Sequence, residues 1–377
     1  MDKNKIADSI LNLADSIEKG VFESKITIAV TNFGSELGTD NINNAILQSR
    51  SQLFNIIVVG EPLEGFESYE ACGDDEIARV LKKLFEDKKI DAAVTMHYPF
   101  PIGVSTVGKI ITPATGKEMY IATSTGTMDG NRIKAMILNA INGIIVAKAD
   151  GIENPTVGIL NIEGAKVVEK KLLELSNNGF EINFVSSKRS DGSFIMRGND
   201  LVAGTPDIMV CDSLTGNVIV KTFATFQSGG FYETTGYGYG PSIGSGYENA
   251  VFIISRASGT PLIKNAIMFA YESIKGNLLE ISKDLYEKAK KAKIDEILNS
   301  LNNKNQESNE DIVAPEAEIV TESIAGIDIL EIDSAVQCLW KEGIYAESAM
   351  GCTGPIVMIN SVNLEKAKEV LEKAEFI

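Results

Sequence analysis

Short apolar runs alternate with amphipathic segments between residues 25 and 300. The runs are rich in β-branched residues, as strands are, and lie at 25–30, 55–60, 91–96, 119–123, 156–161, 206–211 and 251–255. Helical spacing fills most of the intervals, at 75–88, 131–148, 163–176 and 214–224. This alternation predicts an α/β fold with a mainly parallel sheet covered by helices on both faces. Because ligands of such folds bind at the carboxyl ends of strands, we expect chemistry in the loops after these runs.

Helical patterns also mark both ends of this body, which we place at residues 1–298. Near the N-terminus, Ile6, Ile10, Leu13 and Ile17 trace one face of an amphipathic helix within residues 1–20. Acidic residues interrupt that segment, which argues against a signal peptide. A long helix with an apolar stripe from Leu278 to Ala292 closes the body.

The chain changes character after residue 298. Residues 299–318 are polar and almost free of large apolar side chains, which predicts a flexible linker. Residues 319–377 regain order, with a short amphipathic helix around "SAVQCLWKEG", a strand at "PIVMIN" and a helix at "NLEKAKEVLEKA". A module of this size is too small to be robust alone, so we expect it to dock on the body or on a partner.

The net charge of −17, from 52 acidic and 35 basic residues, excludes some partners. Such a surface repels nucleic acid and anionic lipid. No run approaches the ~20 apolar residues of a membrane span, so we expect a cytoplasmic protein. The four cysteines form no CxxC pair and the sequence has one histidine, so neither a metal site nor a disulfide is expected.

One of these cysteines stands out in "ESAMGCTGPI", residues 347–356. Glycines flank Cys352, which removes the side chains that would shelter its sulfur. An accessible thiol can act as nucleophile and as leaving group, which makes Cys352 a candidate catalytic residue, but the motif alone leaves its purpose open. The alternative is a small buried cysteine in a tight turn. Cys72, Cys211 and Cys338 are expected to be inert.

Two strand-to-helix loops are candidates for binding phosphate. "TSTGTMDGNR", residues 123–132, offers Ser124, Thr125 and Arg132 at the start of a predicted helix. "DSLTGNVIVK", residues 212–221, offers Thr215 and Lys221 to phosphate and Asn217 to a developing oxyanion. Asp212 could orient these donors or accept a proton. It could equally well cap the helix that follows.

Two further features leave several interpretations open. His97 follows a predicted strand, where it could act as general base or phosphate ligand. Residues 228–249 hold seven glycines but open no clear helix, so they are not a dinucleotide fingerprint. A mobile lid or a partner-docking loop is the interpretation we favour, with simple flexibility as the alternative.

Three segments resemble one family in the same order along the chain. "AKADGIENPTVGILNI" (147–162), "DLVAGTPDIMVCDSLTGNVIVKT" (200–222) and "SGTPLIK" (258–264) are similar to motifs of the PlsX family of phosphate acyltransferases. That family makes acyl phosphate from acyl carrier protein and inorganic phosphate. The resemblance implies a three-layer α/β/α fold like that of isocitrate and isopropylmalate dehydrogenases, shared with phosphotransacetylases. Lys166 is nearest to the family's lysine.

A PlsX-like body followed by "AMGCTGPI" resembles the α subunits of component C of glycine/sarcosine/betaine reductase complexes. The resemblance implies that Cys352 carries an acetyl thioester and that phosphate releases it as acetyl phosphate, without a cofactor, in anaerobic amino-acid fermentation. It implies as partners a ketoacyl-synthase-like β subunit and the selenoprotein A that carries the carboxymethyl group, in an oligomer.

Two alternatives stay open. One is a PlsX-type enzyme acting on longer acyl chains. The other is a non-catalytic scaffold, because the loops "TNFGSELGTD" (31–40) and "TMHYPFPIGV" (95–104) depart from the PlsX pattern.

Overall fold

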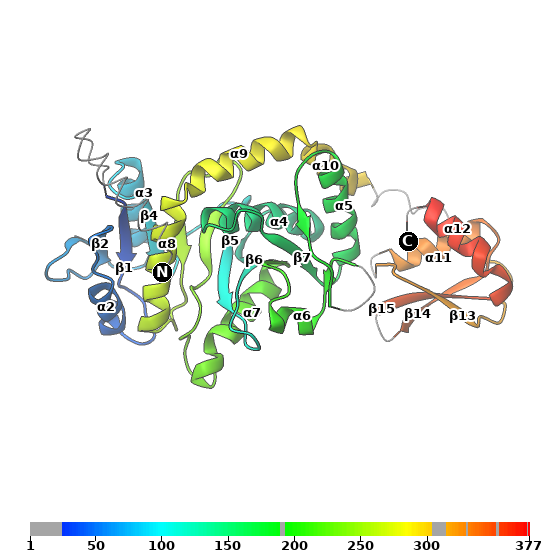
Figure 1. The fold of residues 1–377 in the computed structure, drawn as a ribbon, viewed down its shortest axis with the longest axis horizontal. Coiled ribbons are helices and arrows are strands. Elements are labelled where there is room, and N and C mark those ends of the chain that lie inside the picture. Colours follow the sequence, from blue (N-terminus) through cyan, green and yellow to red (C-terminus); the bar gives the residue numbers. More distant parts are fainter. Residues whose placement is uncertain (1–24, 189–192, 304–313, 329–330, 352–353, 375) are drawn as a thin grey trace, which may run out of the picture.

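The computed structural model describes residues 25–188, 193–303, 314–328, 331–351, 354–374 and 376–377. It contains a large body and, beside helix α5 of that body, a small C-terminal module (Figure 1). The predicted N-terminal helix, residues 1–20, lies outside the described residues.

A 12-stranded sheet forms the middle layer of the body, in the order β3-β2-β1-β4-β12-β11-β5-β6-β10-β7-β8, with β9 also paired to β7. Its strands are β1 (Thr27–Thr31), β2 (Asn55–Gly60), β3 (Glu67–Glu70), β4 (Ala92–Thr95), β5 (Val104–Ile111), β6 (Glu118–Thr127), β7 (Thr156–Leu160), β8 (Asn183–Phe184), β9 (Ile195–Met196), β10 (Ile208–Val210), β11 (Gly240–Ile243) and β12 (Val251–Ile253). Each of the seven predicted runs coincides with one of these strands.

The sheet consists of two parallel halves that run in opposite directions. Strands β1, β2, β3, β4 and β12 form the first half-sheet, and β6, β7, β8, β9 and β10 form the second. Between them β11 is antiparallel to β12 and to β5, and β5 is antiparallel to β6. These three reversals turn the carboxyl edges of the two half-sheets to opposite sides.

Strand β11 corrects the prediction for residues 228–249. Its four residues are buried at the centre of the sheet, so this part of the segment is not a lid. Gly240 has a φ of 77°, and a Cβ there would lie 1.7 Å from the carbonyl oxygen of Val107. Glycine therefore serves a close approach of two backbones at this position, and not the movement of a lid.

Helices cover both faces of the sheet, which confirms the three-layer α/β class. Their bounds are α2 (Thr39–Gln48), α3 (Asp74–Glu86), α4 (Arg132–Ala149), α5 (Ala165–Asn177), α6 (Gly198–Ala203), α7 (Ser213–Thr225), α8 (Thr260–Lys275), α9 (Leu278–Lys291) and α10 (Ile294–Asn303), with the short 3-10 helix η1 (Phe226–Ser228) after α7. One apolar cluster joins the sheet to α2, α4, α5, α8, α9 and α10, and clusters on the other face join it to α3, α6 and α7. No helix among the described residues is long and apolar enough to cross a membrane.

The C-terminal module has a core of its own. It contains β13 (Glu322–Ala325), α11 (Ile332–Lys341), β14 (Ala346–Gly351), β15 (Gly354–Ile359), η2 (Ser361–Asn363) and α12 (Leu364–Lys373). The three strands form an antiparallel sheet in the order β13-β15-β14, and its apolar cluster holds only residues of the module.

The body extends further than the sequence predicted. Helix α10 reaches Asn303, beyond residue 298, because Ile297 and Leu301 are buried against the core of the body. The first five residues of the predicted linker, 299–303, are therefore helical, and residues 304–313 lie outside the described residues.

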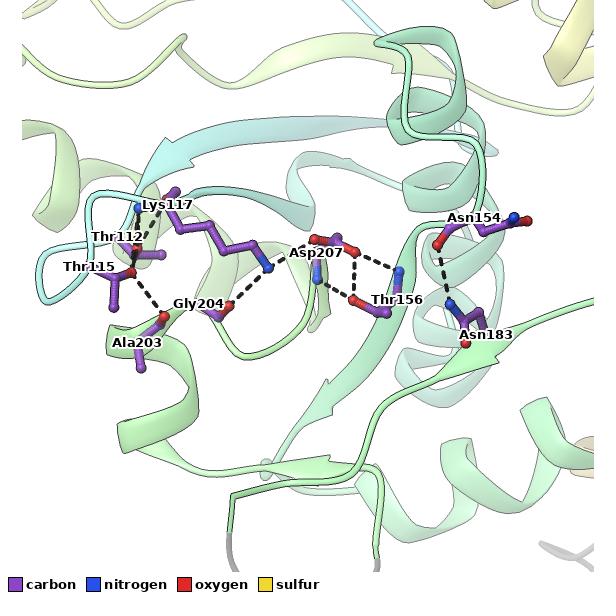
Figure 2. A network of polar contacts seen from close by, with 9 residues as sticks. All are labelled: Thr112, Thr115, Lys117, Asn154, Thr156, Asn183, Ala203, Gly204 and Asp207. Atoms are coloured by element: carbon purple, nitrogen blue, oxygen red, sulfur yellow. Dashed lines mark hydrogen bonds and ion pairs between the residues drawn. The ribbon is translucent and has the colours of Figure 1, made fainter.

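A polar network ties the amino ends of three strands of the second half-sheet together (Figure 2). Asp207, just before β10, accepts hydrogen bonds from the backbone N and the Oγ1 of Thr156 at 2.8 and 2.6 Å. Lys117, just before β6, forms an ion pair with Asp207 at 2.9 Å and donates to the carbonyl of Gly204. Burial opposes ionisation of Asp207, yet the hydrogen bonds from Thr156 and the Lys117 ammonium hold its pKa below the ordinary value.

Candidate functional site

The candidate site lies at the opposite, carboxyl edge of the second half-sheet, where β6, β7 and β10 end. Asp212 follows β10 and caps α7, with Oδ1 accepting from the backbone N of Leu214 and of Thr215 at 3.1 and 3.0 Å. Its Oδ2 accepts from Thr215 Oγ1 at 2.7 Å. The capping role considered from the sequence is thus confirmed.

Arg132 connects Asp212 to a third strand end. At the start of α4, its guanidinium lies 2.9 Å from Asp212 Oδ2 and 2.8 Å from Glu163 Oε2, which follows β7. The side chain of Asp212 is 15% exposed, whereas that of Glu163 is 50% exposed. The pair with Glu163 is therefore the weaker of the two, because water screens it.

The ionisation of Asp212 follows from these contacts. Burial disfavours its charged form, but the hydrogen bonds from Thr215 and the Arg132 guanidinium hold its pKa below the ordinary value. A carboxylate held in this way is a poor proton acceptor near neutral pH. Its geometry suits it to fixing Arg132 instead.

A pocket of about 210 Å³ opens beside these groups. It is lined by the end of β6, the loop into α4 and the start of α7: Thr123, Gly126, Thr127, Met128, Asp129, Gly130, Arg132, Ala135, Asn139, Asp212 and Ser213. The N-termini of α4 and α7 therefore meet at one cavity. Helix N-termini favour anions because their N–H groups and dipoles point outward, and Arg132 adds a full positive charge.

Close packing of α7 on β6 sets the shape of this pocket. A Cβ at Gly216 would lie 1.7 Å from the carbonyl oxygen of Thr123, so only glycine allows the helix to come so near. In the next position, the Asn217 side-chain amide donates to the carbonyl of Ser124 at 3.1 Å. Asn217 thereby fixes the helix on the strand, and this donor is already engaged.

Three other predicted phosphate ligands point elsewhere. Ser124 is buried and bonds to Thr106 Oγ1 and to the carbonyl of Tyr239, at 2.8 and 2.7 Å. Thr125 bonds to the same Thr106 hydroxyl at 3.0 Å. Strand β6 continues through both residues, and the pocket is reached by Thr123 and Thr127 instead. Lys221 lies further along α7 and faces the buried Glu233 at 3.8 Å.

Two further predicted residues, Lys166 and His97, are not brought into the pocket. Lys166 lies in the first turn of α5 and pairs with Glu169 at 3.1 Å. His97 is exposed in the loop after β4, at the carboxyl edge of the first half-sheet, which faces the other way. Cys352 lies outside the described residues, between the last residue pair of the β14–β15 hairpin, Gly351 and Gly354.

The other three cysteines differ in their surroundings. Cys211 is buried directly after β10, and burial raises the pKa of its thiol far above the ordinary value. Burial, followed by Glu342, also raises the pKa of Cys338. Cys72 is exposed.

Sequence reasoning missed Glu163, Asn131 and Asp129. Asn131 caps α4 by accepting from the backbone N of Ile133 and of Lys134, and Asp129 accepts from the backbone N of Asn131 at 2.7 Å. The signal for Glu163 was available, since it follows a predicted strand of the same half-sheet. Its partner, however, is 31 residues away along the chain.

Comparisons with known proteins show which family the chain belongs to. A family described as "Fatty acid synthesis protein" matches residues 26–358, and the chain belongs to this family of PlsX-like proteins. A "Phosphate acyltransferase" from Acetivibrio thermocellus is 30% identical over 135 residues, which cover 34% of either chain.

One relative matches the body and the module together. The "Glycine/sarcosine/betaine reductase complex component C subunit alpha" of Peptoclostridium acidaminophilum is 45% identical over 380 residues, covering 100% of this chain and 99% of that one. This confirms the resemblance predicted from "AMGCTGPI" and the PlsX-like motifs. Among solved structures, a branched-chain phosphotransacylase from Enterococcus faecalis V583 aligns with a TM-score of 0.47 at 16% identity, over 66% of this chain and 99% of that one.

Proposed function

We propose that the protein transfers an acetyl group from a thioester on Cys352 to inorganic phosphate, as the α subunit of a component C. The observation that carries the proposal is the pocket at which Arg132 and the N-termini of α4 and α7 converge. Such a site favours a phosphate or an acyl phosphate. The full-length similarity to a component C α subunit is the reason why we propose a thioester on Cys352 as the acetyl donor.

In this reaction an oxygen of hydrogen phosphate attacks the thioester carbonyl and forms a C–O bond. The tetrahedral intermediate then collapses, the C–S bond breaks, and the Cys352 sulfur leaves as a thiolate. The proton of hydrogen phosphate passes to that sulfur, directly or through water, so the products are acetyl phosphate and a free thiol. A thiolate is a good leaving group, so no metal is needed to activate it.

Arg132 has the central role in the pocket. Phosphate would take the place of the exposed Glu163 on one side of the guanidinium, while Asp212 holds the other side in position. The same guanidinium would stabilise the negative charge of the tetrahedral intermediate, aided by the dipoles of α4 and α7, whose first N–H groups are already bonded to the caps Asn131 and Asp212.

The volume of the pocket favours a short acyl group. At about 210 Å³ it is smaller than the ~300–1,000 Å³ of sites for drug-sized ligands. Phosphate and a two-carbon group suit this space better than the long acyl chain that a PlsX-type enzyme would bind. The expected partners are a β subunit of component C and the selenoprotein A.

Acetylation of Cys352 tests the proposal. The full chain is incubated with acetyl phosphate, which runs the reaction backwards, and is then analysed by intact mass and peptide mapping. We expect one labile acetyl group on Cys352, absent from Cys352→Ser and retained in Cys338→Ser, the matched control in the same module. Acetylation at another residue, or none even with the β subunit added, would overturn the assignment.

A further inference from the structure

One contact joins the C-terminal module to the body near the candidate site. The backbone N of Lys166, in the first turn of α5, donates to Asp328 Oδ2 at 3.3 Å. Asp328 lies in the loop between β13 and α11 and is only 6% exposed. The module thus presents a buried carboxylate to a helix of the body.

Helix α5 is suited to receive this carboxylate. Its N-cap is Gly164, which offers no side chain, and its first turn contains no acidic residue. The first-turn N–H groups of a helix need acceptors and carry a partial positive charge. Asp328 supplies from the module what other helices of the body obtain locally, such as α4 from Asn131 and α7 from Asp212.

The strand register of the module places this contact at the Cys352 end of its sheet. Ala325, the last residue of β13, pairs with Ile356 of β15, and β15 begins two residues earlier at Gly354. Asp328 follows Ala325 by three residues. At ~3.3 Å per residue and ~4.8 Å between strands, the contact loop and the hairpin end are within roughly 10–15 Å of each other.

On the body, the same contact lies at the edge that holds the pocket. Glu163 is three residues before Lys166 and bonds to Arg132, which in turn bonds to Asp212. The module therefore contacts the start of α5 three residues from the side chain that bonds to the pocket arginine. Figure 1 shows the module beside α5.

We propose that Asp328 is the docking residue that positions the module with its Cys352 end toward the Arg132–Asp212 pocket. The inference rests on the proposed function, because docking matters only if Cys352 delivers an acyl group. Asp328 is a positioning residue and touches no reacting atom. Its carboxylate fixes where the carrier module sits on the body.

Asp328→Ala tests this in the full chain, with Asp333→Ala as the matched control, since Asp333 is an exposed carboxylate in the same module. Cys352 is first acetylated with acetyl phosphate, which is then removed, and the loss of the acetyl group is followed after addition of inorganic phosphate. We expect a roughly tenfold slower transfer in Asp328→Ala, as for the loss of a charged helix cap, and no change in Asp333→Ala. Amide hydrogen exchange at the start of α5 should become faster only in Asp328→Ala.

The outcomes separate the two proposals. If wild-type Cys352 is never acetylated, the proposed function fails. If Cys352 is acetylated and Asp328→Ala transfers at the wild-type rate with α5 still protected, only the docking proposal fails. If amide hydrogen exchange within α11 and β15 shows that Asp328→Ala unfolds the module, the docking proposal is tested with Asp328→Asn instead. It keeps a capping side chain but loses the charge, so a rate between wild type and zero with an intact module supports docking, and an unchanged rate overturns it.

Discussion

Two aspartates stand at opposite ends of the three-residue strand β10, and each bonds to a threonine and to a cationic side chain. Asp207, before the strand, accepts from the backbone and hydroxyl of Thr156 and pairs with Lys117. Asp212, after the strand, accepts from the backbone and hydroxyl of Thr215 and pairs with Arg132. In both, burial opposes ionisation and these partners lower the pKa.

The surroundings of the two carboxylates nevertheless differ. The partners of Asp207 join the beginnings of strands and the loop at Gly204, so this network links parts of the fold to one another and does not line the pocket. The partners of Asp212 lie at helix N-termini around a pocket, and its arginine turns a second side toward an exposed, exchangeable carboxylate. The same local chemistry therefore stabilises the fold at one edge of the sheet and is available to a ligand at the other.

Removal of Arg132 should give the largest effect. We expect Arg132→Ala to lower the rate of acetyl phosphate formation by about 10²–10³-fold, as for the loss of a main oxyanion donor. The corresponding change at the other edge, Lys117→Ala, should leave the rate of the folded protein unchanged. Steady-state assays of both variants measure this, and equal losses would show that the two edges do not differ in function.

Removal of Asp207 should show the reverse pattern. Asp207→Ala leaves the Thr156 donors without their acceptor, and we expect the free energy of unfolding to fall by about 1–3 kcal/mol. Asp212→Asn keeps a good N-cap, so its stability should change by less than about 1 kcal/mol while activity drops. Urea unfolding compares the two, and an unstable Asp212→Asn with full activity would contradict the comparison.

The smallest expected effect is the loss, at acid pH, of the contribution that Asp207 makes to the free energy of unfolding. Since the pKa of Asp207 is lower in the folded than in the unfolded chain, its contribution to stability is present above the unfolded pKa of ~3.9 and is lost as pH falls through the folded pKa. The difference in unfolding free energy between wild type and Asp207→Asn should therefore be constant from pH 7 to about pH 5 and shrink below pH 4. Urea titrations at these pH values measure it. A difference that grew on acidification would show that the folded pKa is raised.

The sequence predicted seven of the ten strands in the two half-sheets, all but β3, β8 and β9, because these seven are short, apolar and β-branched. It missed β5 and β11, since "VSTVGKII" and "GPSI" mix polar residues, glycine and proline with apolar ones. Those two strands set the relative direction of the half-sheets. Their absence from the prediction therefore made His97 a candidate for the same site as Asp212, although it lies at the other half-sheet's edge.

Within the site, Asp212 and Arg132 were predictable because each directly follows a strand end or opens a helix. The direction of Ser124 and Thr125 was not, because β6 continues to Thr127 and its register against β5 shifts between Ala122 and Thr125, which changes which side chains reach the pocket. Nor could the sequence show that Asn217 is occupied by the Ser124 carbonyl, since that contact spans 93 residues. Tertiary packing of α7 on β6 determined both.

The module has a separate apolar core yet belongs to the same polypeptide as the body, and this affects how strongly it must bind. A tethered partner experiences an effective concentration on the order of millimolar, which dilution of the protein does not change. An interface with a dissociation constant near that value would be occupied about half of the time. Such an interface needs only about 4 kcal/mol, of which one carboxylate on one helix terminus supplies about 0.5–2 kcal/mol, so under the proposed function the module could deliver its group and still leave the body to be reloaded elsewhere.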